Sequence, residues 1–202
     1  MKFVLLTQPQ HKFSTVTSNY IKTAQNHKLE KLNEIIKLNF FKLLDNEFPI
    51  SEFENWIYEQ DSLLEIELDK TVYFDLISFN YKHEKSLFQL KEKLKQTIDT
   101  KEFVIWKIRN LLQNIIDEKI NLVIATRKLR DLYYETDEKL IPITLGVGYE
   151  SEFEDVPIPS EYYQWEIDSL SEKLKKVDLY RNSIIQESKE LLIELNNKNN
   201  CW

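Results

Sequence analysis

The sequence predicts an all-α protein, a single-domain multi-helix bundle of about seven or eight helices with one long irregular loop over residues 136–160. Only two glycines, Gly146 and Gly148, occur in 202 residues, where average usage would give about fourteen. Apolar residues recur every three or four positions, which places them on one face of a helix. Both glycines and three of the five prolines lie in the segment expected as a loop.

The chain is expected to consist of a lead-in and one helical domain. Residues 1–28 are rich in Ser, Thr, Asn and Gln and show little periodicity, so we expect them to be loosely ordered. No repeat or low-complexity linker interrupts residues 29–202, which favours a single α-helical domain there. The hydrophobic content of 42% is enough to fill its core.

The first helices are predicted from apolar stripes and from the breaks between them. One stripe runs from Leu29 to Leu43 at helical spacing. Pro49 ends that segment, because proline cannot continue a helix. Ser51 and Glu54 have the spacing of a capping box, in which both side chains bind backbone amides at a helix start. A short helix is therefore expected to follow.

The central helices are predicted in the same way. Asp69 is a candidate N-cap, since its carboxylate can accept from a backbone amide in the first turn. Apolar stripes then predict helices over residues 87–98 and 122–133, with a strongly amphipathic helix between them that opens at Thr100.

The C-terminal residues 160–202 contain no glycine and no proline. Ser160 is a candidate N-cap, and Ile167 begins an apolar stripe at helical spacing that continues along the segment. This pattern predicts either one long helix or two abutting helices.

Charge is unevenly distributed along a chain of formal net charge −7. Residues 1–29 contain four lysines and no acid, whereas residues 50–69 contain seven acids and no base. Residues 147–172 contain eight acids and again no base. Such stretches repel nucleic acid and attract basic surfaces. We therefore expect no nucleic-acid partner.

The chain lacks the patterns of common enzymes and metal sites. None of its histidines, His11, His27 and His83, lies three or four residues from another or in a Glu-x-x-His pair, which argues against helical zinc and di-iron sites. There is no Gly-x-Ser-x-Gly motif, P-loop or dinucleotide fingerprint. We expect a protein without catalytic residues, cofactor or metal, with an enzyme of unusual site as an alternative.

The compartment is predicted from the same kind of reasoning. A single cysteine, Cys201, excludes an intramolecular disulfide framework and favours the cytoplasm. The apolar run Phe3–Leu6 is too short for the core of a signal peptide. No apolar run approaches the length of about 18 residues that a membrane span needs. We therefore expect a cytoplasmic protein with no membrane partner.

An acidic and aromatic segment is the candidate partner-binding site. Carboxylates speed encounter with a basic partner, and partly exposed rings supply contact area. The candidate residues are Tyr149, Glu150, Glu152, Phe153, Glu154, Asp155, Tyr162, Tyr163 and Trp165, with Glu59 and Asp61 from a second such mixture. The alternative is that the rings belong to the core and the acids only solvate it. Helical spacing favours that alternative for Phe53 and Trp56, and it stays open for residues 148–165.

The same acids also allow a different interpretation. Oxygen ligands suit calcium or magnesium, so the cluster from Glu150 to Asp155 could be a cation site. It lacks the glycine, Asp and Asn positions of a known calcium loop. A solvated acidic loop is therefore favoured.

A set of packing motifs is spread over residues 45–195. Its positions are Phe53, Glu54, Trp56 and Tyr58; Tyr73, Leu76, Ile77 and Tyr81; Trp106; Leu132 and Tyr133; and Leu145, Gly146, Val147 and Gly148 before the acidic segment. In these motifs the chain resembles small α-helical immunity proteins of bacterial polymorphic-toxin systems. The resemblance implies an α-helical fold and one-to-one inhibition of a cognate toxin. Glu135, Thr136 and Asp137 depart from it, since a glycine is usual there, and residues 1–28 have no counterpart.

These observations lead to two functional expectations. The first is an immunity-type protein that binds and neutralises a cognate toxin, such as a nuclease, by covering a basic surface of it. The second is a self-associating helical adaptor or scaffold without catalytic activity, which would form a homodimer. A tight homodimer that buries the aromatic residues would favour the adaptor.

Overall fold

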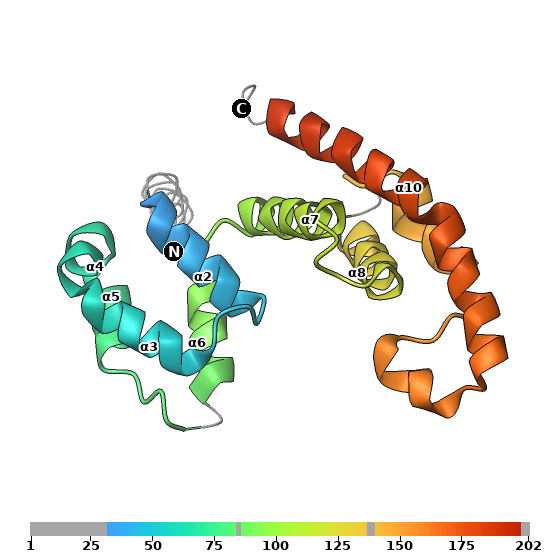
Figure 1. The fold of residues 1–202 in the computed structure, drawn as a ribbon. Helices are drawn as coiled ribbons and strands as arrows, with labels where there is room; N and C mark the ends of the chain where they lie inside the picture. The colour runs from blue at the N-terminus through green and yellow to red at the C-terminus, as the bar shows by residue number, and fades with distance from the viewer. Residues whose placement is uncertain (1–31, 84–85, 137–139, 199–202) are drawn as a thin grey trace, which may run out of the picture. The chain divides into compact units, whose positions relative to one another are not determined.

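The computed structural model describes residues 32–83, 86–136 and 140–198. These residues form helices and no strand, which confirms the all-α prediction (Figure 1). The lead-in predicted for residues 1–28 and the helix start predicted at Leu29 lie outside the described residues. None of the described helices is both long and apolar enough to cross a membrane.

The chain divides into two compact units, residues 1–99 and residues 100–202. The single domain expected over residues 29–202 stays a prediction. Within the described residues the two units contain nine α-helices, one π-helix and one 3-10 helix. The short helices α4 and α9 account for the excess over the number expected from apolar stripes, because neither is long enough to show a stripe.

The first unit contains five helices in the described residues. They are α2 (Glu34–Leu44), α3 (Ile50–Glu59), α4 (Asp61–Glu67), α5 (Lys70–Ile77) and α6 (Ser86–Lys95). Helix α3 packs against α2, α4 and α5, and α2 also packs against α6. Phe53 is fully buried, with its ring 6.1 Å from that of Phe40 and 5.6 Å from that of Trp56. This packing confirms the core assignment for Phe53, while Trp56 is half-buried and packs one side of its ring against Phe53.

The helix starts of this unit correct one prediction and confirm another. Asp69 accepts a hydrogen bond of 2.9 Å from the backbone amide of Thr71, as its predicted cap requires. The capping box of Ser51 and Glu54 is wrong, because that box needs a helix that begins at Glu52, and α3 begins two residues earlier, at Ile50. Pro49 stands at the N-cap position, where its φ of −58° leads into the helix, and its carbonyl accepts from Phe53 N at 2.9 Å.

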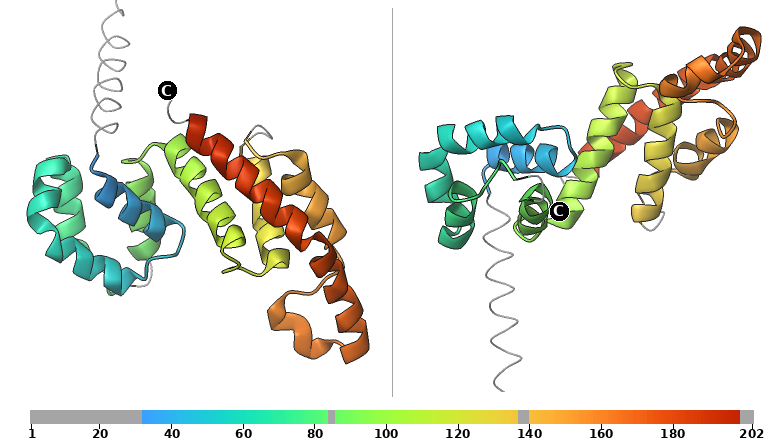
Figure 2. Two further views of the ribbon diagram at one scale, coloured as in Figure 1. Left: turned by 45° about the horizontal axis from the view of Figure 1, so that its top comes forward. Right: turned by 90° about the horizontal axis from the view of Figure 1, so that it is seen from below.

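The second unit is built around a helix of 32 residues. Its elements are α7 (Thr100–Ile116), α8 (Leu122–Glu135), the π-helix η1 (Thr144–Gly148), α9 (Tyr149–Glu152), the 3-10 helix η2 (Pro159–Gln164) and α10 (Ile167–Lys198). Helix α10 packs mainly along α7. At about 1.5 Å per residue it is roughly 48 Å long. Its N-terminal part extends past α7 and α8, with η2 folded beside it (Figures 1 and 2).

The C-terminal pattern resolves into one uninterrupted helix rather than two. The expected N-cap at Ser160 is wrong, since Ser160 lies inside η2 and α10 begins at Ile167. Pro159 explains this difference, because a proline at the first position of η2 starts a short helix of its own before α10 begins.

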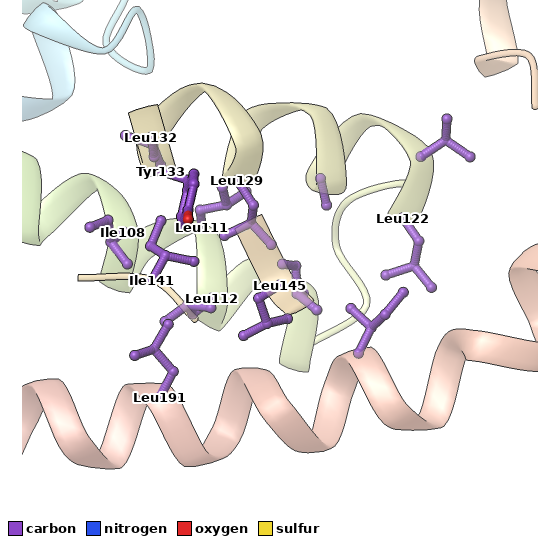
Figure 3. Close-up of a cluster of buried hydrophobic side chains, with 14 of the residues drawn as sticks. Ile108, Leu111, Leu112, Leu122, Leu129, Leu132, Tyr133, Ile141, Leu145 and Leu191 are labelled. Atoms are coloured by element: carbon purple, nitrogen blue, oxygen red, sulfur yellow. The ribbon is translucent and has the colours of Figure 1, made fainter. Parts of the chain in front are cut away.

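The core of the second unit forms where its helices meet. Figure 3 shows Ile108 and Leu112 from α7 beside Leu129 from α8, Leu145 from η1 and Leu191 from α10. The first four are fully buried and Leu191 is 4% exposed. Burying such a side chain contributes roughly 1.5–3 kcal/mol each. These contacts fix α10 against α7 and thereby support its projecting end.

Residues 136–160 were expected to form one long irregular loop, but part of this segment is helical. It contains η1 and α9 as well as irregular turns. Gly146 is buried against the ring of Tyr133, so that a Cβ placed on it would lie 2.5 Å from Cδ2 of that ring. Gly146 allows η1 to pack closely against α8 and does not form a turn. The glycines therefore wrongly indicated a loop at this position.

Candidate partner-binding surface

The predicted contact residues of the second unit fall into two groups. The first covers α9 and the turn after it, from Tyr149 to Asp155, and the second lies on η2 and the residues before α10, from Tyr162 to Trp165. The two groups differ in exposure and in how far their carboxylates are paired with cations.

The rings of the first group belong to the core of the second unit. Phe153 is 1% exposed, and its ring lies 6.0 Å from that of Tyr180 on α10. Tyr149 is half-buried, and its hydroxyl donates to a carboxylate oxygen of Glu187. Burial, and then this hydrogen bond, raises the pKa of Tyr149 to about 12. Phe153 was therefore wrong as a contact residue, because short helix α9 turns its ring inward.

The carboxylates of the first group are paired within the same unit. Arg130 of α8 lies 2.5 Å from Glu150. Lys173 of α10 donates to Asp155 at 2.6 Å, and this hydrogen bond holds the pKa of that carboxyl below its usual range. Lys176 lies 3.6 Å from Glu152 and 3.8 Å from Asp155.

A stretch without bases in sequence is thus supplied with cations by other helices. Of its four acids, only Glu154 has no ion pair within the described part of the chain. Three of the four carboxylates therefore have a cation partner from the same unit. Among the described residues no group of three or more His, Cys, Asp or Glu is arranged to hold a metal ion.

The second group is exposed. Tyr163 is 83% exposed, Ile167 is 84% exposed and Trp165 is 38% exposed, while Tyr162 is half-buried. The acids Glu166 and Asp168 alternate with these apolar residues and are exposed. We call residues 162–168 the η2 tip. Glu166 and Asp168 make no ion pair within the residues that the structure describes.

Two local contacts hold the η2 tip in place. At its start, the backbone amide of Ile158 donates to a carboxylate oxygen of Glu161 at 3.1 Å, which fixes the first turn of η2. At its end, Nζ of Lys173 lies 4.9 Å from the centre of the Trp165 ring, within the range of a cation–π contact. The tip is therefore connected to α10 by side chains as well as by the backbone.

Ile167 is a surface residue that the sequence analysis missed. Its helical spacing placed it in the inward stripe of the last helix, but it stands at the first residue of α10, beyond the core. Its neighbours in sequence, Trp165 and Glu166, were the available signal, because they extend the acidic and aromatic composition to this position.

The candidate residues of the first unit are separate from these groups in sequence. Glu59 is exposed at the end of α3. Asp61 accepts a hydrogen bond of 2.7 Å from the hydroxyl of Tyr73, and this bond raises the pKa of Tyr73 to about 12. Asp61 therefore has a structural role in joining α4 to α5.

Comparison with known protein families, with curated proteins and with solved structures finds no match to this chain.

Proposed function

We propose that the chain is an immunity-type binding protein that neutralises a cognate bacterial toxin, and that the η2 tip is the surface that meets a basic region of that toxin. The proposal assigns no catalytic role to any residue. Its contact residues are Tyr162, Tyr163, Trp165, Glu166, Ile167 and Asp168.

One observation carries the choice of surface, namely exposed apolar side chains set among carboxylates that make no ion pair with the described residues. Large rings and aliphatic side chains at an interface supply most of its binding energy. Carboxylates around them speed association with a basic partner and disfavour wrong ones. Asp168 also stabilises the positive N-terminal end of α10, but that role leaves the exposure of Tyr163 and Ile167 unexplained.

The kind of partner follows from charge and from the resemblance. The chain has a net charge of −7, and Glu166 and Asp168 of the η2 tip make no ion pair in the part of the chain that the structure describes. A cationic protein surface is therefore the natural complement. That this protein is a toxin is proposed from the motifs of residues 45–195 that resemble immunity proteins.

Self-association through the same surface is less favoured. In a two-fold symmetric dimer each residue meets the same patch on the partner copy. Glu166 and Asp168 of one copy would then approach those of the other, and like charges in an interface are costly. A basic partner avoids this repulsion, so the adaptor hypothesis ranks second.

The direct test is to express the products of the genes adjacent to the one for this chain, and to measure whether the chain binds any toxin among them and protects cells from it. Trp165→Ala with Ile167→Ala should raise the dissociation rate at least tenfold, since each truncation removes contact area in the centre of the tip. Glu166→Lys with Asp168→Lys should slow association, with the difference shrinking at high salt. Surface plasmon resonance separates the two rates, and growth of toxin-producing cells reports protection.

The matched control is Glu190→Lys, which changes an exposed acid elsewhere on α10. It should leave both rates within about twofold of the wild type. Unchanged protection by both tip variants would rule out this surface. Failure of the wild-type chain to bind any toxin, together with a concentration-dependent dimer in sedimentation, would favour the adaptor.

A further inference from the structure

The first unit contains a groove that the proposed toxin surface does not use. It has a volume of about 610 Å³ and lies between α5 and α6, next to the residues that lead into α2. Its apolar lining comes from Leu32, Leu68, Val72, Leu76, Leu90 and Leu94. An apolar groove of this size can receive several side chains of an occupant.

The rim of the groove is acidic. Glu67, Asp69 and Asp75 line it together with one cation, Lys93. Lys93 lies 2.6 Å from Asp75, and both side chains are about half exposed, at 48% and 45%. Glu67 makes no ion pair within the described residues and leaves negative charge at the rim, so an occupant should combine apolar side chains with cations.

Such a segment occurs in this chain, immediately before the groove. Residues 1–29 contain four lysines and no acid. Phe13, Val16 and Tyr20 supply apolar side chains in the same stretch. The segment joins the described chain at Leu32, which itself lines the groove.

Covalent attachment makes this encounter favourable. A tethered segment meets its site at an effective concentration in the millimolar range, so even weak contacts suffice. Leu32 follows Lys22 by ten positions, and an extended chain over ten positions spans about 33 Å.

We propose that the groove between α5 and α6 binds the basic segment of the same chain within residues 12–31, with apolar side chains inserted and lysines at the acidic rim. Because it lies in the first unit, this contact is independent of the η2 tip. A basic peptide of another protein, or the same segment of a second copy, would be the competing occupants.

Zero-length carbodiimide cross-linking of the full chain at low micromolar concentration tests the contact. Lys12, Lys22 or Lys28 should form amide bonds with Glu67 or Asp75 in the monomer, identified by mass spectrometry of peptides. These bonds should disappear in high salt, because exposed charges are then screened. Their absence from the monomer, or their presence in cross-linked dimers alone, would overturn the proposal.

Hydrogen exchange on the full chain provides a second measurement with matched variants. Val72→Trp fills the groove, and Glu67→Gln removes one rim charge. Glu65→Gln is the control, because Glu65 is exposed on the same helix and does not line the groove.

Amides of residues 12–28 should lose protection completely in Val72→Trp and about twofold to fivefold in Glu67→Gln, as expected for one exposed charge pair. Glu65→Gln should match the wild type. Thermal unfolding confirms that each variant is folded. Full protection retained in a folded Val72→Trp variant would overturn the proposal, as would exchange at unfolded-chain rates in the wild type.

Discussion

Nζ of Lys173 lies 4.9 Å from the centre of the Trp165 ring and 2.6 Å from a carboxylate oxygen of Asp155. One cation of α10 therefore contacts both the exposed aromatic tip and the acidic turn that precedes it. The contact joins the two parts of the segment that the sequence marked as a binding site. It also separates their roles, because Asp155 is paired and the tip acids Glu166 and Asp168 have no ion pair in the described chain.

Lys173→Met should loosen the η2 tip. The change removes the cation–π contact and leaves Asp155 with the more distant Lys176, while the methionine keeps most of the apolar stem. We expect the fluorescence of Trp165 to shift toward that of a solvated indole and stability to fall by about 0.5–1.5 kcal/mol. The chain has four tryptophans, so the emission of Trp165 is obtained by subtracting the spectrum of the same protein with Trp165→Phe. Lys175→Met, at an exposed position two residues on, should change neither quantity.

Gly146→Ala should destabilise the second unit. The new Cβ would lie 2.5 Å from the ring of Tyr133, closer than packed atoms approach. We expect a loss of about 1–3 kcal/mol, because overpacking forces the ring or η1 to move. Chemical denaturation measures it.

Gly148→Ala is the control for that prediction. Its Cβ would meet nothing nearer than the carbonyl oxygen of Ile143 at 3.8 Å, and its φ of −58° suits any residue. Stability should stay equal or rise by about 0.4–1 kcal/mol, because alanine restricts the unfolded chain. Equal losses at Gly146 and Gly148 would mean that the close approach to Tyr133 is not the cause.

Local features of the fold could be predicted because their causes are local. Apolar stripes predicted α7 and α8, since the helical repeat alone decides which side chains share a face. Asp69 was identified as a cap because the amide it binds is two residues away. The capping box predicted at Ser51 was wrong because Pro49, two residues earlier, provides a competing helix start.

The candidate site was predicted less well because its state depends on residues distant in sequence. Nothing near Glu150 indicates that Arg130, on another helix, neutralises it. The burial of Phe153 likewise depends on Tyr180 of α10. Tyr163 kept its predicted exposed character, at 83%, whereas Trp165 is 38% exposed because Lys173 of α10 lies over its ring.

Asn121→Ala should destabilise α8. The Asn121 side chain accepts from the backbone amides of Val123 at 3.0 Å and Ile124 at 3.3 Å. Removing an N-cap of this kind costs about 1 kcal/mol. Ser51→Ala is the comparison, because Ser51 lies inside α3 and caps nothing; its unfolding free energy should change by less than about 0.5 kcal/mol. A larger loss at Ser51 than at Asn121 would contradict both helix starts.

Tyr149→Phe should reduce the loss of stability at alkaline pH. The folded state raises the pKa of Tyr149 to about 12, above the ordinary value of about 10. A raised pKa contributes stability that is complete below pH 10 and is lost as the pH rises from about 10 toward 12. Removing the hydroxyl deletes this dependence, along with the hydrogen bond to Glu187.

The measurement is thermal unfolding of wild type and variant between pH 8 and pH 11.5. At pH 8 the variant should be less stable by about 1–2 kcal/mol, because Glu187 loses a donor. The gap should narrow as the pH rises, since the wild type alone loses the contribution of Tyr149. Tyr163→Phe, on an 83% exposed ring, should run parallel to the wild type. A gap that stays constant to pH 11.5 would show that neither burial nor the hydrogen bond to Glu187 raises the pKa of Tyr149 in the folded state.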